Sequence, residues 1–181
     1  MSSFEPVIIL YGSPQTLVNV NIQLPVTFQF AFNIDSLINI INPSSKLSEP
    51  CLKRYFLVLF DLLDRDIYSS LKSNHSIVSI YDYRNVNSIL TQNELNQKMN
   101  SYQQLSLDIT HDIIRFLTIE GEKQYKLERI DLVKIYYQRA RILKEWMMSS
   151  FRVDNMNHTD KYIILSIFLY RLNHVIFYLF H

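Results

Sequence analysis

The sequence predicts a mainly α-helical protein: a helical bundle with a long antiparallel helical hairpin and a small N-terminal β-module. Three patterns lead to this fold class. Apolar residues recur at spacings of three and four from residue 91 to residue 150, strict alternation is confined to the first 32 residues, and residues 162–180 are apolar almost throughout. These patterns divide the chain into a β-module over residues 1–42 and a helical domain over residues 46–181, joined by the Pro-Ser linker at residues 42–45.

The β-module is expected to contain two or three strands. Residues 7–10 form a short apolar run that a Gly-Ser-Pro turn closes at residues 12–14. From residue 17 to residue 32, apolar side chains alternate with polar ones, and Phe28, Phe30 and Phe32 continue that phase. Pro25 cannot donate to a ladder, so it indicates an edge, a bulge or a break.

The helical domain is expected to open with a helix over about residues 49–70. Its buried stripe follows helical spacing and comprises Leu52, Phe56, Leu59, Leu63 and Ile67. Residues 73–88 are polar, with one short strand predicted at residues 77–81. A final helix is expected to begin near Thr159 and Asp160, which are both favourable N-terminal residues.

The hairpin is the best-patterned region. Thr91 and Glu94 match a capping box that begins a helix with a coiled-coil-like seam, and Gly121 is expected to be its C-cap. The next helix is predicted over residues 122–150. Its packed stripe would be Val133, Tyr136, Ala140, Leu143 and Met147, and its solvated stripe Asp131, Lys134, Gln138, Arg141 and Glu145. A short turn between the two helices predicts antiparallel packing.

The composition argues against several classes of function. The sequence contains only two glycines, which are too few for a glycine-rich phosphate-binding loop or a dinucleotide-binding motif. No zinc or calcium motif is present, and a net charge of +1 disfavours a strongly basic nucleic-acid clamp. Cys51 is the only cysteine, which excludes an intramolecular disulfide and fits a reducing compartment. The N-terminus lacks the basic region of a secretory signal. We expect no enzymatic activity, no cofactor and no metal.

Three small groups could carry chemistry, and each has a structural interpretation that the sequence favours. Asp61 and Asp64 would share a helix face that could hold Mg²⁺, but Arg65 beside them favours a solvated helix end. Cys51 at a helix start could be a stabilised thiolate, but a small buried residue is favoured. His111 and Asp112 are adjacent, so they diverge around a helix and do not form a dyad.

The basic residues of the second hairpin helix have two interpretations. They lie among aromatic residues and could form a phosphate-contacting stripe with stacking rings. Interleaved acids favour an ordinary salt-bridged helix face instead. The residues concerned are Lys126, Arg129, Lys134, Arg139, Arg141, Lys144 and Arg152.

Residues 162–180 are nearly long enough to span a bilayer. Arg171, Asn173 and His174 lie near the middle of this stretch, where charge is expensive in lipid. A helix packed on protein is therefore favoured. A peripheral or tail-anchored membrane protein that uses residues 160–181 remains the alternative.

One segment resembles a known family. Residues 127–133 read LERIDLV and residues 137–144 read YQRARILK. This is similar to the long helix of GINS subunits, whose complex joins the replicative helicase. A second similarity is VNIQLP at residues 20–25, although Val26-Thr27-Phe28 replaces the tryptophan of the family pattern. The resemblance implies a non-catalytic scaffold subunit of a nuclear DNA-replication complex, in which Arg139 and Arg141 pack or pair between subunits.

The expected function is therefore that of a non-enzymatic scaffold or interaction subunit of a multiprotein complex. The 48% hydrophobic and 19% charged fractions favour a surface that meets other subunits in a hetero-oligomer. The cell nucleus is expected rather than the cytoplasm. The partner-binding residues predicted from the two last helices are Tyr136, Arg139, Arg141, Trp146, Phe168 and Phe177.

Overall fold

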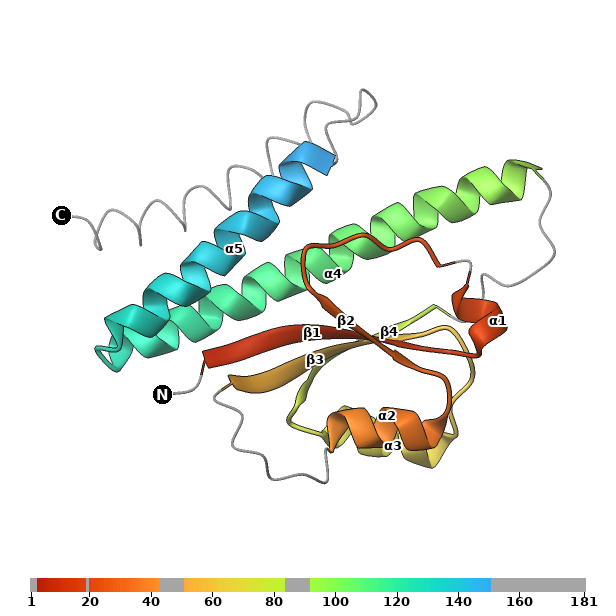
Figure 1. The fold of residues 1–181 in the computed structure, drawn as a ribbon, viewed down its shortest axis with the longest axis horizontal. Helices are drawn as coiled ribbons and strands as arrows, with labels where there is room; N and C mark the ends of the chain where they lie inside the picture. The colour runs from red at the N-terminus through yellow and green to blue at the C-terminus, as the bar shows by residue number, and fades with distance from the viewer. Residues whose placement is uncertain (1–2, 19, 43–50, 84–91, 151–181) are drawn as a thin grey trace. The chain divides into compact units, whose positions relative to one another are not determined.

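The computed structural model describes residues 3–18, 20–42, 51–83 and 92–150. Strands and short helices alternate through the first part, and two long helices follow (Figure 1). In chain order the elements are β1 (Ser3–Tyr11), α1 (Pro14–Leu17), β2 (Thr27–Ala31), α2 (Ile34–Ile41), β3 (Cys51–Leu59), α3 (Arg65–Ser73), β4 (Ile77–Asp82), α4 (Gln92–Lys126) and α5 (Ile130–Ser150).

The four strands form one parallel sheet in the order β2-β1-β3-β4. The prediction of a mainly helical bundle is therefore wrong, and the fold is mixed α/β. The predicted β-module supplies only half of the sheet, because β1 pairs with β3 from Ser3–Cys51 to Tyr11–Leu59. Parallel strands buried on both faces have continuous apolar runs rather than alternation, and helical spacing can be read into such runs.

The error is clearest at β3, which the sequence analysis assigns to a helix over residues 49–70. Residues 55–60 are six consecutive apolar side chains, and all six are buried. A helix would have turned some of them to solvent. The structure instead places a central strand here, then α3, and the strand predicted at residues 77–81 is confirmed as β4. α2 is an element that the sequence analysis missed.

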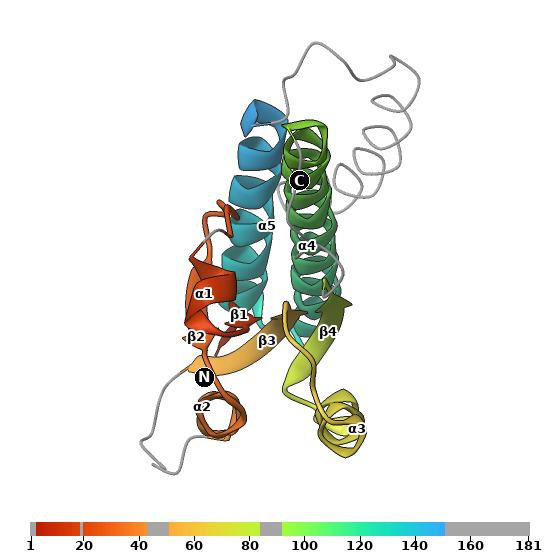
Figure 2. The same ribbon diagram turned by 90° about the vertical axis from the view of Figure 1, so that its right-hand side faces the viewer.

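The handedness of the crossover connections explains which helices lie on the same face of the sheet. The connections from β2 to β3 and from β3 to β4 run in the same direction across the sheet, so right-handed crossovers place α2 and α3 on one face. Figure 2 shows α2 and α3 on one side of the sheet and α1, α4 and α5 on the other. The strand order reverses between β1 and β3, which makes that pair the switch point of the sheet.

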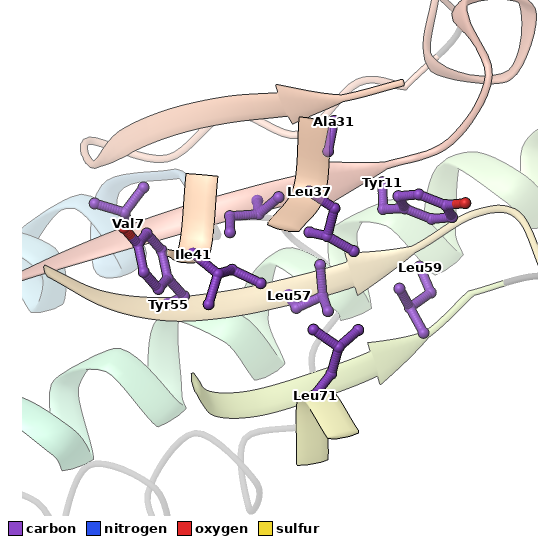
Figure 3. Close-up of a cluster of buried hydrophobic side chains, with 10 residues drawn as sticks. Val7, Tyr11, Ala31, Leu37, Ile41, Tyr55, Leu57, Leu59 and Leu71 are labelled. Atoms are coloured by element: carbon purple, nitrogen blue, oxygen red, sulfur yellow. The ribbon is translucent and has the colours of Figure 1, made fainter. Parts of the chain in front are cut away.

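One core lies between the sheet and the α2–α3 layer (Figure 3). The odd-numbered residues of β1 and β3 face this layer, because successive side chains of a strand point to opposite faces. Leu37 and Ile41 of α2 and Leu71 of α3 pack onto them. The cluster comprises Val7, Ile9, Tyr11, Ala31, Leu37, Ile41, Tyr55, Leu57, Leu59 and Leu71.

Aromatic contacts join the opposite face to α4. The Phe116 ring lies edge-on to Phe4 and Phe56, with ring centroids 6.3 and 6.1 Å apart. Further along the sheet, Phe60 and Tyr102 have centroids 6.4 Å apart. Edge-to-face pairs at such separations are favourable beyond the area that they bury.

The junction between α4 and α5 differs from the predicted one. Gly121 is not a C-cap: α4 continues to Lys126, and Gly121 makes room for the Tyr137 ring, since an added Cβ would lie 3.2 Å from Tyr137 Cζ. The helix ends in a Schellman motif, in which Arg129 N–H donates to the Gln124 carbonyl and Glu128 has a φ of 57°.

The contacts described between α4 and α5 lie near this junction and do not show the predicted long antiparallel hairpin. α5 itself follows the predicted amphipathic pattern. The five residues of its solvated stripe are exposed, and four residues of its packed stripe are buried, with Met147 partly buried. Thr91, the predicted cap of the first helix, lies outside the described residues, as do the linker at residues 43–45 and the final predicted helix.

The chain divides into two compact units, residues 1–147 and residues 148–181. The first contains the whole sheet, with strands from both sides of the linker predicted at residues 42–45.

Candidate functional site

α5 is tied to the sheet at the N-terminal end of β1. β1 begins four residues before the first β1–β2 pair, Val7–Thr27, so among the described residues no strand lies beside the backbone of Phe4 on that side. Phe4 N–H donates to the Tyr136 hydroxyl at 2.8 Å, and the Phe4 carbonyl accepts from the Arg139 guanidinium at 2.7 Å. Two side chains of α5 thus replace the missing strand and satisfy polar backbone groups that would otherwise be unpaired.

This geometry gives two of the predicted partner-binding residues an internal role. Tyr136 is fully buried, so its ring is unavailable to a partner in this structure. Arg139 is partly buried and holds the Phe4 carbonyl. Arg141 is exposed and pairs with Glu145 at 2.8 Å, and the hydrogen bond that Arg141 donates to this carboxylate raises the pKa of Arg141. Trp146 is partly buried. Phe168 and Phe177 lie outside the described residues.

A row of apolar side chains lies along one side of α5, between its packed and solvated stripes. Ile135 and Ile142 are 37% and 49% exposed, and Trp146 continues the row. The spacings of seven and four residues place these three side chains within one narrow sector of the helix. We call Ile135, Ile142 and Trp146 the α5 flank.

The carboxyl end of the sheet is where ligands bind in many open α/β folds, at the switch point between two strands. Here Gly12–Thr16 follow β1 and Asp61 follows β3. The Asp61 carboxylate accepts from Ser13 N–H at 2.5 Å and from the Thr16 hydroxyl at 3.1 Å. The Ser13 and Thr16 hydroxyls are 2.8 Å apart. Asp61 thus fixes the loop after β1 from the neighbouring strand.

These contacts favour a structural role for Asp61. Both carboxylate oxygens already accept hydrogen bonds from the chain itself. The DLLDRD segment is not the end of a helix, as the sequence analysis expects, but the loop from β3 into α3. Asp64 is the N-cap of α3 and accepts from Asp66 N–H at 2.8 Å. Among the described residues, no group of three His, Cys, Asp or Glu side chains is placed to hold a metal ion.

A second polar cluster joins α4 to β4. The Tyr81 hydroxyl donates to Asp112 Oδ2 at 2.6 Å, and the Ser79 hydroxyl lies 3.4 Å from the same oxygen. Burial first, and then the bond to Asp112, raise the pKa of Tyr81. His111 Nδ1 lies 3.8 Å from Asp112 Oδ1. The alternation of Ser79 and Tyr81 along β4 was the signal for this cluster, and sequence reasoning missed it because it weighed His111 and Asp112 alone.

The structure also contains a pocket of about 260 Å³ between α2 and α3. Ile38, Ile41, Ile67 and Leu71 form its apolar part, and Asn42, Ser70 and Asn74 its polar part. The side chains around it carry no charge, so the pocket offers no group for acid–base or nucleophilic chemistry beyond one serine.

The basic residues of α5 are partly engaged within the chain. Arg139 and Arg141 make the bonds described above, and Arg129 lies 3.4 Å from the Gln124 side-chain oxygen. Of these three bonds, the one between Arg141 and Glu145 is an ion pair of the kind expected on a salt-bridged helix face, whereas Arg139 binds a backbone carbonyl and Arg129 an amide oxygen. In the part of the chain that the structure describes, no helix is both long enough and apolar enough to cross a membrane. Comparison with protein-family models, with curated proteins and with solved structures finds no match for this chain.

Proposed function

We propose that the chain is a non-enzymatic interaction subunit that binds a partner protein through the α5 flank. The observation that carries this proposal is the exposure of Ile135 and Ile142 on a helix whose neighbouring stripe is already packed. Single exposed apolar residues are common on protein surfaces, but a row of two isoleucines and a tryptophan on one helix sector is typical of helices that pack on another chain.

The remaining contacts of α5 support this role. Tyr136 and Arg139 hold the helix on β1, so the flank belongs to a fixed element rather than to a loop. A rigid helix loses little conformational entropy when a partner packs on it, which favours binding. Beside the flank, Asp131 and Glu145 provide a polar rim that stays in water, as rims of interfaces do.

The partner is proposed to be another protein subunit. The resemblance of residues 127–144 to GINS subunits suggests a replication complex of the nucleus as the assembly. Of the segment that carries this resemblance, residues 127–129 form the turn between α4 and α5, and residues 130–144 lie in α5.

The experiment is purification of the tagged full-length chain from its native host, compared with two substitutions. Ile142→Asp places a charge in the flank, and Leu62→Asp places the same charge at a leucine that is 78% exposed elsewhere. The proposal predicts a stoichiometric protein partner that Ile142→Asp loses and Leu62→Asp retains. Recovery of the wild-type chain without a stoichiometric partner, or equal loss in both variants, would contradict it.

A further inference from the structure

We infer that two copies of this chain associate through the outer edge of β2, so that their sheets join into one. This inference does not use the α5 flank and is independent of the function proposed above. β2 lies at the end of the strand order, and among the described residues no strand pairs with its outer side.

The direction of the backbone groups identifies the open edge. Gly12 N–H donates to the Ala31 carbonyl at 3.1 Å, so Ala31 points toward β1. Because backbone groups alternate in direction along a strand, the N–H and C=O groups of Phe28 and Phe30 point away from β1. The side chains of these two residues lie on the face of the sheet that α4 covers at the inner strands. An incoming strand would therefore hydrogen-bond to these two residues.

β2 lacks the charged side chains and the proline that protect many edge strands. Natural edge strands often carry a charged residue, usually lysine, or a proline, and both discourage pairing. Residues 27–32 read TFQFAF and contain neither. The N-terminal part of β1 shows the contrast, since Tyr136 and Arg139 cap its open side. Phe30 and Phe32 are each 51% exposed and stack with centroids 6.4 Å apart and planes 10° apart.

A second copy fits this edge because the edge is complementary to itself. Antiparallel pairing about a two-fold axis keeps the aromatic faces of both copies on the same side. The register centred on residue 30 sets residue 30 opposite its own copy and residue 28 opposite residue 32, which forms aromatic cross-strand pairs. Since residues 27–32 carry no charge, no like charges meet across the contact.

The test is sedimentation velocity of the full-length chain from low micromolar to several hundred micromolar concentration. The expected result is a reversible dimer, which Phe30→Lys weakens about tenfold or more by placing like charges opposite each other. Leu62→Lys, at an exposed leucine away from β2, is the matched control and should dimerise like the wild type. Ile142→Asp should also dimerise, which separates this contact from the α5 flank.

Three outcomes would overturn the inference: a wild-type chain that stays monomeric throughout, a Phe30→Lys variant that dimerises as tightly as the wild type, or an equal loss with Leu62→Lys. Far-UV circular dichroism checks that each variant is folded. Should Phe30→Lys unfold the strand, Phe32→Lys replaces it in the same comparison, because Phe32 follows the last residue of β2 and is equally exposed.

Discussion

Replacing each of two adjacent tyrosines of α5 by phenylalanine should change stability in opposite directions. The Tyr136 hydroxyl accepts the Phe4 N–H at 2.8 Å and is fully buried. The Tyr137 hydroxyl is also buried, but it has no hydrogen-bond partner among the residues that the structure describes. Each substitution removes one oxygen and leaves the ring, so the pair isolates the contribution of the hydrogen bond from that of packing.

The expected magnitudes follow from what each hydroxyl does. Tyr136→Phe leaves a partly buried backbone donor without its acceptor, which should cost about 1–2 kcal/mol of unfolding free energy. Tyr137→Phe removes a polar atom that was desolvated without compensation, so it should be neutral or stabilising by up to about 1 kcal/mol. For a chain of this size, the first change corresponds to a fall in Tm of roughly 2–8 °C.

Urea unfolding followed by circular dichroism measures both variants against the wild type. With an m-value of about 2 kcal/mol/M, Tyr136→Phe should lower the urea midpoint by roughly 0.5–1 M without a change in m. The attachment of α5 to β1 through this bond would be refuted if Tyr136→Phe had the same urea midpoint as the wild type. It would also be refuted if Tyr137→Phe lowered the midpoint as much as Tyr136→Phe.

Three further predictions concern the loops and the pH dependence. Glu128 has a left-handed φ of 57° at the end of α4, so Glu128→Gly should raise the urea midpoint by the equivalent of about 1 kcal/mol, and a lowered midpoint would contradict the motif. Asp61→Ala removes the carboxylate that accepts hydrogen bonds from Ser13 and Thr16, so it should lower the free energy of unfolding by about 1–3 kcal/mol in the same assay. An unchanged urea midpoint would contradict the structural role of Asp61. Burial, assisted by Glu122, raises the pKa of Tyr137 from 10.0 to about 12, so its contribution to stability is complete below pH 10.0 and is lost as the pH rises through about 12. Urea midpoints across that interval should fall less steeply in Tyr137→Phe than in the wild type, and identical slopes would contradict the shift.

Helices with one packed and one solvated side were predictable from the sequence. The stripes of α5 match the predicted sets because an amphipathic helix shows its period directly. β4 was also predicted, since Ile77–Asp82 is short and bounded by polar residues. The boundaries were less accurate: α4 runs five residues past Gly121, because what Gly121 provides is room for a ring from another helix, and a single sequence does not show that contact.

The parallel sheet was not predictable by the same reasoning. Residues 55–60 are apolar on both faces of β3, and a run of that kind has neither helical nor strand period. The attachment of α5 was hidden for a related reason. Tyr136 and Arg139 were predicted to bind another chain, but their partner is the backbone of Phe4, 132 and 135 residues earlier in the chain.

The central functional claim is that the α5 flank binds a partner protein. Hydrogen exchange with mass spectrometry, performed on the chain alone and on its purified complex, tests this most directly. The account predicts that partner binding slows exchange in peptides that span residues 135–146, while peptides from α2 and α3 on the far face of the sheet exchange as before. Unchanged exchange in residues 135–146, with protection confined to other elements, would contradict it.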